Sequence, residues 1–366
     1  MSGKKRVGIV FGGKSAEHEV SLQSAKNVVD AIDKDKYDVT LIGIDKAGNW
    51  HVNDTGNYLE NENDPSNIRL HHSDESVAVV PGREEQQFLQ VTEREALEQL
   101  DAIFPILHGT LGEDGSIQGM MRIANIPYVG PDILGSAVCM DKDVAKRLLR
   151  EAGIDVAKSL TVRKRNKDDV TFTKAARTLG TPFFIKPASQ GSSVGVSKVN
   201  TEEEFDKALD EAFLYDKKVL IEENVEGREL ECAVLGNEEP KASHVGEILP
   251  AGDFYSYESK YIDESGAGLQ LPADLKEEEE ERIRKEAVRA FEVLECEGMA
   301  RVDFFLTNSG KLVINEVNTI PGFTKISMYP KLWDISGLPY PKLIDELIEL
   351  GIQRHERDSQ LKNTVE

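Results

Sequence analysis

Two strand-like runs within residues 301–318 constrain the fold most tightly. Each run contains apolar residues interrupted by polar ones, and a short polar turn ending in glycine joins them, which predicts a β-hairpin. Side chains alternate across a strand, so Arg301 and Asp303 share one face of the first run. By the same rule Glu316 and Asn318 share one face of the second run. The hairpin therefore brings polar side chains that are distant in sequence face to face.

The oxygen atoms on this hairpin suggest a metal site. Asp303 and Glu316 supply carboxylates and Asn318 supplies an amide oxygen. Such hard ligands are the ones that Mg²⁺ prefers when it also holds polyphosphate oxygens. A solvated polar face of a sheet explains the same pattern, so the hairpin alone leaves both interpretations open.

Length and hydrophobicity limit the classes of protein. A chain of 366 residues exceeds the size at which one core keeps growing, so we expect two or three domains. The hydrophobic fraction of 39% is enough for packed cores, and no apolar run approaches the length of a membrane span. The first residues lead directly into a strand-like run without a signal-type segment. We therefore expect a cytoplasmic protein.

Charge and cysteine content exclude further classes. The net charge is −22, which disfavours binding to nucleic acid or an anionic membrane, because both require clustered Lys and Arg. The three cysteines Cys139, Cys232 and Cys296 are widely spaced and form no Cys-x-x-Cys pair. This argues against a disulfide framework and a zinc site. We expect buried free thiols.

The first section of the chain, to about residue 130, predicts parallel βαβ units. Strand-like runs alternate with helix-like ones there. The expected strands are residues 7–11, 37–44 and 102–107, and the expected helices are residues 21–32 and 93–100. Residues 50–90 are irregular.

Two places in this section are candidates for ligand contact. Gly12 and Gly13 close the first strand, and Glu17 precedes the helix, but the Gly-x-Gly-x-x-Gly pattern is absent. Such a turn either presents backbone N–H groups to a small anion, with Glu17 holding an ammonium, or is ordinary strand-to-helix geometry. His108 lies where a later strand opens into a glycine-rich loop, at the sheet edge where ligands gather. It faces either a substrate or the protein interior.

The second section suggests a nucleotide site. Lys186 ends a strand, and the Gly/Ser loop 190–195 follows it. Such a loop can cover phosphates while a strand lysine supplies countercharge, although no Walker A motif is present and an ordinary glycine hairpin has the same composition. A strand over residues 218–225 ends in acids and precedes an alternating strand over residues 227–234. That hinge suits an adenine amino group and ribose hydroxyls.

The combined motifs resemble the D-alanine:D-alanine ligases of the ATP-grasp superfamily. The resemblance covers about residues 6–350 and depends on the order of all the motifs, since each alone is weak or moderate. The motifs are residues 11–21, 108–115, 140–142, Lys186, residues 190–195, Lys260-Tyr261, residues 301–303 and residues 315–324.

The resemblance implies an α/β protein with the ATP-grasp fold, built from three α/β domains of which the first is Rossmann-like. It places an N-terminal domain over residues 1–130, with the first D-alanine site and a homodimer contact. A central subdomain follows over residues 131–225. The C-terminal subdomain, residues 226–366, carries the metal site and a lid loop over residues 251–270.

The resemblance also assigns roles to residues. Those expected to contact ATP are Lys142, Lys186, Ser193, Glu222, Glu223, Val225 and Glu229. Asp303, Glu316 and Asn318 are expected to hold two Mg²⁺ ions, for which Mn²⁺ can substitute.

The amino-acid sites follow in the same way. Glu17 is expected to bind the ammonium of the first D-alanine, and Ser327 the carboxylate of the second. Arg301 and the Gly322 N–H form the oxyanion site. The remaining expected roles belong to the lid: Lys260 offsets phosphate charge, and Tyr261 joins Ser192 and Glu17 in a hydrogen-bonded set.

The implied activity is the ATP-dependent joining of two D-alanine molecules through a D-alanyl phosphate, for peptidoglycan precursor synthesis. Three alternatives differ from it. A D-alanine:D-lactate ligase would share the motifs, although Lys260-Tyr261 favours the dipeptide enzyme. An NAD oxidoreductase would share the βαβ start but needs the absent glycine motif. A regulatory nucleotide-binding module would share the fold without catalysis.

Overall fold

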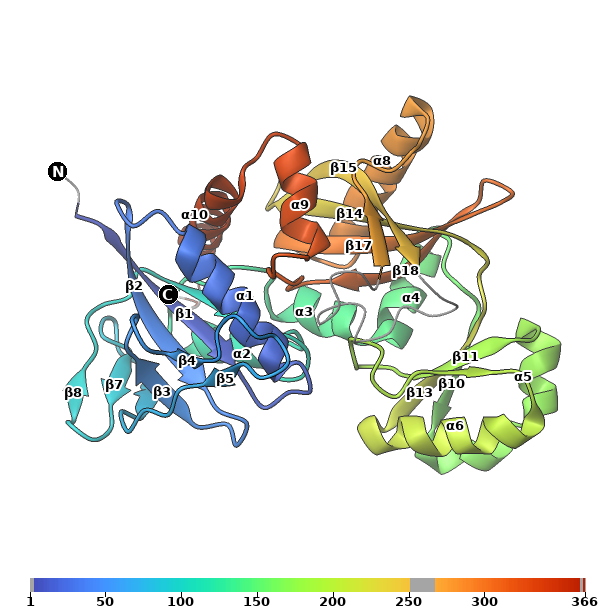
Figure 1. Cartoon of the computed structure of the whole chain (residues 1–366), viewed down its shortest axis with the longest axis horizontal. Coiled ribbons are helices and arrows are strands. Elements are labelled where there is room, and N and C mark those ends of the chain that lie inside the picture. Colours follow the sequence, from blue (N-terminus) through green and yellow to red (C-terminus); the bar gives the residue numbers. More distant parts are fainter. Residues whose placement is uncertain (1–2, 251–266, 363–364, 366) are drawn as a thin grey trace.

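The computed structural model describes residues 3–250, 267–362 and 365, and it shows a mixed α/β architecture (Figure 1). Within these residues, three larger sheets follow one another along the chain, each with its own flanking helices. Two short antiparallel sheets accompany the first of them. The expectation of three α/β parts is confirmed.

The first sheet is ordered β3-β2-β1-β9. Its central strand β1 pairs in parallel with β2 on one side and β9 on the other. The predicted parallel βαβ start is therefore confirmed. The elements are β1 (Lys5–Gly12), α1 (His18–Ala31), β2 (Tyr37–Ile44), β3 (Trp50–Asn53), β9 (Ala102–Ile106) and α2 (Ser116–Ile123).

The predicted helix over residues 93–100 is wrong. Arg94 has a φ of 59°, which interrupts any helix, and Glu95–Ala96 form strand β8 against β7 (Phe88–Gln90). Burial of Phe88 favours this hairpin over the helical pattern of the segment. The irregular stretch before it contains the short strands β4 (Leu59–Glu60), β5 (Arg69–Leu70) and β6 (Val77–Val79).

The second sheet is antiparallel, with the order β10-β13-β11-β12. Its apolar side chains and those of two helices form a separate core. In Figure 1 this sheet and its helices form a lobe of their own. The elements are β10 (Ser159–Arg163), the 3₁₀ helix η1 (Lys164–Asp169), α5 (Phe172–Leu179), β11 (Phe183–Pro187), β12 (Ser197–Val199), α6 (Glu202–Tyr215) and β13 (Lys218–Glu223).

The third sheet is also antiparallel, with the order β16-β15-β14-β17-β18. The predicted hairpin is its edge pair β17–β18. The strands are β14 (Gly227–Gly236), β15 (Lys241–Pro250), β16 (Ala267–Gln270), β17 (Gly298–Thr307) and β18 (Leu312–Asn318). The last four residues of the expected lid segment 251–270 form β16; the others lie outside the described residues.

The remaining helices come from segments before and after the second sheet in the sequence. They are α3 (Ile133–Met140), α4 (Lys142–Glu151), α8 (Glu277–Val293), α9 (Met328–Ile335) and α10 (Tyr340–Ser359). Side chains of α4 and α8 share one core with the third sheet. The expected thiols Cys139, Cys232 and Cys296 are buried and free.

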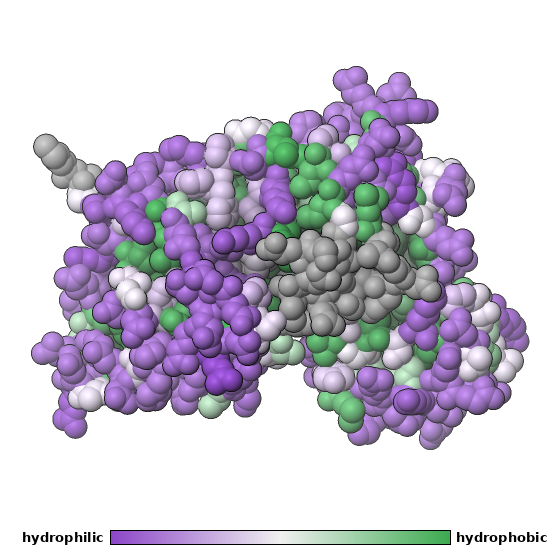
Figure 2. Space-filling model, in the orientation of Figure 1, coloured by the Kyte–Doolittle hydropathy of each residue, from purple (hydrophilic) through white to green (hydrophobic). Residues whose placement is uncertain are grey.

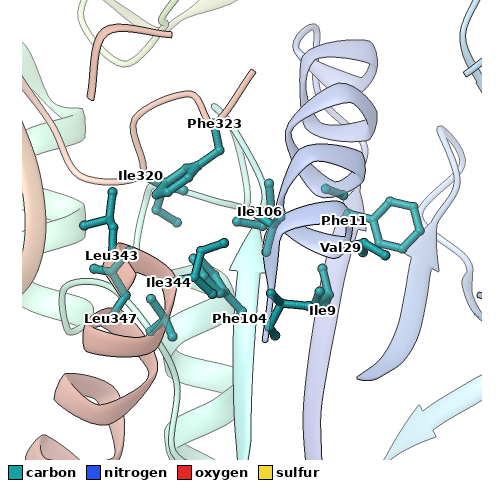
Figure 3. Close-up of a cluster of buried hydrophobic side chains, with 14 of the residues drawn as sticks. Ile9, Phe11, Val29, Phe104, Ile106, Ile320, Phe323, Leu343, Ile344 and Leu347 are labelled. Atoms are coloured by element: carbon teal, nitrogen blue, oxygen red, sulfur yellow. The ribbon is translucent and has the colours of Figure 1, made fainter. Parts of the chain in front are cut away.

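A second core joins the two ends of the chain (Figure 3). Ile9 and Phe104 of the first sheet pack there with Ile320, Phe323 and Leu347, the last of which belongs to α10. The N-terminal sheet therefore depends on a C-terminal helix for its packing. The domain boundaries at residues 130 and 225 stay predictions, because the cores extend across them.

Hydrophilic side chains cover most of the face seen in Figure 2, outside the grey residues. This agrees with the acidic composition. In the part of the chain that the structure describes, we find no helix that is long and apolar enough to cross a membrane.

The shared core predicts coupled stability. Leu347 is fully buried in it, so Leu347→Ala should lower the free energy of unfolding by about 2–5 kcal/mol. Amide hydrogen exchange should speed up in β1 and β9 as well as in α10. Leu209→Ala, at an equally buried leucine of the second sheet's core, should instead speed exchange around α6 and β11. Unchanged exchange in β1 and β9 of Leu347→Ala would contradict the shared core.

Candidate active site

The hairpin places its polar side chains as predicted. Arg301 pairs with Asn318 and Asp303 with Glu316 in the strand register, so all four project from one face. The Arg301 guanidinium donates to both carboxylate oxygens of Asp303, at 2.7 Å each, and Asn318 Nδ2 donates to Asp303 Oδ2 at 2.9 Å. These contacts fix the Asp303 carboxylate against the sheet.

The donor set on the hairpin fits a hard divalent cation. Asp303, Glu316 and Asn318 offer two carboxylates and an amide oxygen, which suit Mg²⁺. Among the described residues no three His, Cys, Asp or Glu side chains cluster as a metal site. The expected set has only two such side chains, so that finding does not oppose it.

A cavity of about 200 Å³ lies beside the hairpin, between the second and third sheets. Its wall includes every residue expected to contact ATP. They are Lys142, Lys186, Ser193, Glu222, Glu223, Val225 and Glu229. We call this space the nucleotide cavity.

Lys142 reaches the nucleotide cavity from the first turn of α4. The Asp141 side chain accepts hydrogen bonds from the backbone N–H groups of Asp143 and Val144 and so caps the helix. Lys142 Nζ lies 3.2 Å from Glu316 Oε2 and donates to the Gln190 carbonyl at 2.8 Å. Burial lowers the pKa of Lys142, but the carboxylates of Glu316, Glu222 and Glu113 together outweigh it and leave the pKa raised. Lys142 is therefore a charged group in the cavity wall.

The hinge carboxylates have protein partners. Glu222 Oε1 accepts a hydrogen bond from Lys186 Nζ at 2.6 Å, and Glu222 Oε2 lies 2.8 Å from Lys146 Nζ. Glu223 Oε1 accepts from the Lys158 backbone N–H at 2.7 Å.

The sequence analysis missed Lys146. Its spacing of four residues from Lys142, which puts both on one helix face, could have indicated it.

A second cavity, of about 70 Å³, adjoins the first. Its wall includes most of the residues expected to bind amino acids or form the oxyanion site. They are Glu17, His108, Ser192, Arg301, Gly322 and Ser327. Gly191, Ser192 and Glu316 line both cavities, so the two spaces share a wall. We call this second space the amino-acid cavity.

The loop between the two cavities has a strained backbone. Ser192 and Ser193 have φ angles of 50° and 61°, in the left-handed region that residues other than glycine rarely adopt. This conformation directs Ser192 Oγ to the Glu17 carboxylate, to which it donates a hydrogen bond. The predicted contact between Ser192 and Glu17 is present, and Lys260 and Tyr261 lie outside the described residues.

The turn before Glu17 has ordinary strand-to-helix geometry. Gly12 N–H donates to Ser21 Oγ at 2.7 Å and Gly13 N–H to the Ile44 carbonyl at 2.8 Å. The amides of Gly12 and Gly13 are therefore already paired within the protein, and an anion contact from the rest of the turn stays a prediction. Gly12 has a φ of 89°, and a Cβ there would lie 2.3 Å from the Ile44 oxygen, so glycine is required.

Glu113 is a buried carboxyl group that the sequence analysis missed. It accepts hydrogen bonds from Gly109 N–H at 2.8 Å and from Ile320 N–H at 3.1 Å, which ties the first sheet to the segment after β18. Burial, and then repulsion by Glu17, raise the pKa of Glu113 well above its ordinary value. Its place in a loop that contains three glycines was the available signal.

His108 lines the amino-acid cavity, but both its ring nitrogens have protein partners. Nδ1 lies 3.0 Å from the Ile320 carbonyl, which can only accept, so Nδ1 carries the proton. Nε2 then accepts from Ser24 Oγ at 3.0 Å. Burial lowers the pKa of His108 to about 4. His108 is therefore neutral at pH 7, and its ring links Ser24 to the segment at Ile320. Its expected contact with a substrate stays a prediction.

Arg301 has a second carboxylate partner that the sequence analysis missed. Glu231 is buried on β14, opposite Asp303 in the register, and its Oε2 lies 2.9 Å from Arg301 Nε. Alternation along β14 puts Glu229 and Glu231 on one face, which was the available signal.

Ser327 lies at the edge of the same cavity. Its Oγ accepts a hydrogen bond from Thr324 N–H at 2.9 Å.

Comparisons with known proteins agree with this arrangement. Two family models match, described as the D-ala D-ala ligase N-terminus over residues 6–131 and the D-ala D-ala ligase C-terminus over residues 148–349. A D-alanine--D-alanine ligase of Shouchella clausii is 62% identical over 362 residues, which cover 99% of this chain and 98% of the relative.

Solved structures give the same result. A D-alanine-D-alanine ligase from Coxiella burnetii matches with a TM-score of 0.84 and 40% identity, covering 98% of this chain and 97% of that one. The VanG D-Ala:D-Ser ligase from Enterococcus faecalis matches with a TM-score of 0.83 and 40% identity, covering 95% and 99%. Two adjoining cavities at a carboxylate hairpin thus mark a ligase of the ATP-grasp class. The chain belongs to the D-alanine–D-alanine ligase family.

The His108 environment predicts a pH dependence of stability. An unfolded histidine takes up a proton below a pH of roughly 6.5, whereas folded His108 stays neutral down to about 4. Between these values the unfolded state binds more protons, so this contribution is complete above 6.5 and is lost as the pH falls. The slope is about 1.4 kcal/mol per pH unit for one proton.

Urea denaturation of the wild type and of His108→Gln between pH 4 and 7 measures this contribution. The free energy of unfolding should fall more steeply toward acid in the wild type. His72→Gln, at an exposed histidine, should follow the wild-type profile. Parallel profiles for the wild type and His108→Gln would show that His108 is not held neutral.

Proposed function

We propose that this chain joins two D-alanine molecules to D-alanyl-D-alanine at the expense of ATP, and so supplies a peptidoglycan precursor. The observation that carries the proposal is the shared wall of the two cavities. A terminal phosphate in the nucleotide cavity would lie next to a carboxylate in the amino-acid cavity, across Ser192 and Glu316. Close placement of two reactants is a large part of catalysis.

The first step is phosphorylation of a carboxylate. A free carboxylate is a poor acylating agent, so its oxygen attacks the γ-phosphorus of ATP, and ADP leaves. Glu17 holds the ammonium of this first D-alanine. Lys142 and Lys186, in the wall of the nucleotide cavity, offset the phosphate charge. Asp303, Glu316 and Asn318 would hold two Mg²⁺ ions, which neutralise phosphate charge when bound.

The second step forms the peptide bond. The amine of the second D-alanine attacks the acyl carbon, and phosphate leaves. Arg301 and the Gly322 N–H stabilise the oxyanion, and Ser327 meets the carboxylate of the second substrate. One such oxyanion donor is worth about 3–4 kcal/mol of barrier in well-studied enzymes. Water must be kept out, because it would hydrolyse the acyl phosphate.

Three further parts of the proposal come from the family resemblance. Lys260 offsets γ-phosphate charge and Tyr261 joins Ser192 and Glu17, so that the segment 251–270 acts as a lid. The chain forms a homodimer through its first section. The enzyme works in the cytoplasm, where ATP and D-alanine are available.

A substrate comparison tests this function. ADP, phosphate and product should be measured with ATP and Mg²⁺ plus D-alanine, L-alanine, D-lactate or D-serine. When D-alanine is the only amino acid supplied, we expect D-alanyl-D-alanine with one phosphate per dipeptide. We expect no product when L-alanine is supplied instead. The D-lactate and D-serine arms each include D-alanine as first substrate. A depsipeptide or D-alanyl-D-serine as main product there would reassign the second substrate, and the absence of any ADP would refute the ligase activity.

A further inference from the structure

One carboxylate in the wall of the nucleotide cavity is shared by two lysines. Lys186 Nζ donates to Glu222 Oε1 at 2.6 Å, and Lys146 Nζ lies 2.8 Å from Glu222 Oε2. All three residues are buried, with exposed fractions of 9% for Lys186, 4% for Glu222 and 2% for Lys146. A charged lysine as deeply buried as Lys146 is costly unless it is paired with an opposite charge and hydrogen-bonded.

Lys146 approaches Glu222 from behind the cavity. Lys186 and Glu222 line the nucleotide cavity, whereas Lys146 is not part of its wall. Lys146 comes from α4, and it also donates to the Asn315 carbonyl of β18 at 3.1 Å. It therefore connects the hinge strand β13 to the strand that carries the expected metal ligand Glu316.

The charges of this group explain why two lysines are present. If Lys186 were its only partner, Glu222 would neutralise the charge of Lys186. Lys186 would then attract phosphate only weakly. Burial lowers the pKa of Lys146, and the Glu222 carboxylate counteracts this shift. With Lys146 protonated, one carboxylate is shared by two ammonium groups, so the triad carries a net positive charge. Burial tends to raise the pKa of Glu222, but the two lysines outweigh it and leave the pKa lowered. Glu222 is therefore ionised.

We propose that Lys146 is a positioning residue that neutralises Glu222 from behind and so keeps the charge of Lys186 available to the phosphates of ATP. The proposal deepens the proposed function, since it assumes that this cavity binds ATP. It assigns to Lys146 no contact with the nucleotide. Its effect should therefore depend on the phosphates and not on the adenine.

Calorimetric titration of the full chain with ATP or AMP, in Mg²⁺ and without amino acid, tests the proposal. Lys146→Met keeps the length and packing of the side chain but removes its charge. Without Lys146, Glu222 neutralises Lys186, and the charge-assisted contact of Lys186 with phosphate is weakened. ATP should therefore bind about tenfold more weakly, with AMP affinity nearly unchanged. Lys146→Arg should restore most of the ATP affinity.

A double variant separates this role from simple packing. In Glu222→Gln the carboxylate that competes for Lys186 is absent, so adding Lys146→Met should no longer reduce the ratio of ATP to AMP affinity. Lys167→Met serves as the matched control, because Lys167 pairs with Asp210 on the outer side of the same lobe. It should leave both affinities unchanged.

Three results for the variants would overturn the positioning role. Equal weakening of ATP and AMP in Lys146→Met would indicate a packing effect on the cavity, and no change in either would indicate no role. A persistent loss of the affinity ratio in the Glu222→Gln background would mean that Lys146 acts on phosphate directly. Because amino acid is absent, these results do not depend on dipeptide synthesis. Failure of ATP to bind the wild type would instead refute the proposed function.

Discussion

Antiparallel pairing of β17 with β18 is the constraint on which the site depends. It opposes Asp303 to Glu316 and Arg301 to Asn318, and the next strand, β14, opposes Glu231 to Asp303. Because directly opposed side chains share a face, one sheet surface carries three carboxylates, an amide and a guanidinium. A shift of β18 by one residue would turn Glu316 and Asn318 to the face opposite Asp303. The hairpin thus determines where the two cavities meet.

The buried charges around the nucleotide cavity all have partners of opposite charge. Lys142 lies beside Glu316, and Lys186 shares Glu222 with Lys146. A buried pair is costly to form from separated charges in water, so such groups are weak evidence for stability. Their value here is that Lys142 and Lys186 are already desolvated and oriented in the wall of the nucleotide cavity. That is the preorganisation that transfer of a phosphoryl group requires.

Local sequence patterns predicted most of the strands and the faces of the hairpin. Alternation within residues 301–318 was sufficient to group Arg301 with Asp303 and Glu316 with Asn318. It could not reveal Glu231, because the pairing of β14 with β17 joins residues about seventy positions apart and no local pattern encodes that register. Lys146 was missed for a similar reason, since it lies on helix α4 and its partner Glu222 lies far along the chain on β13.

The failed helix over residues 93–100 has another cause. Its helical spacing was real, but Glu95–Ala96 gain strand pairing to β7, and Arg94 adopts a left-handed turn. Tertiary pairing therefore overrode local propensity in a short segment. The family resemblance supplied what local patterns lack, namely which of several weak motifs act together. All seven residues that it assigned to ATP line one cavity.

The central claim is that a carboxylate in one cavity attacks the terminal phosphate in the other. D-Alanine with ¹⁸O in both carboxylate oxygens tests it directly, with mass analysis of the phosphate released during dipeptide synthesis. An acyl phosphate passes one carboxylate oxygen to phosphate, so the account predicts one ¹⁸O atom in each phosphate. Unlabelled phosphate formed together with dipeptide would contradict it.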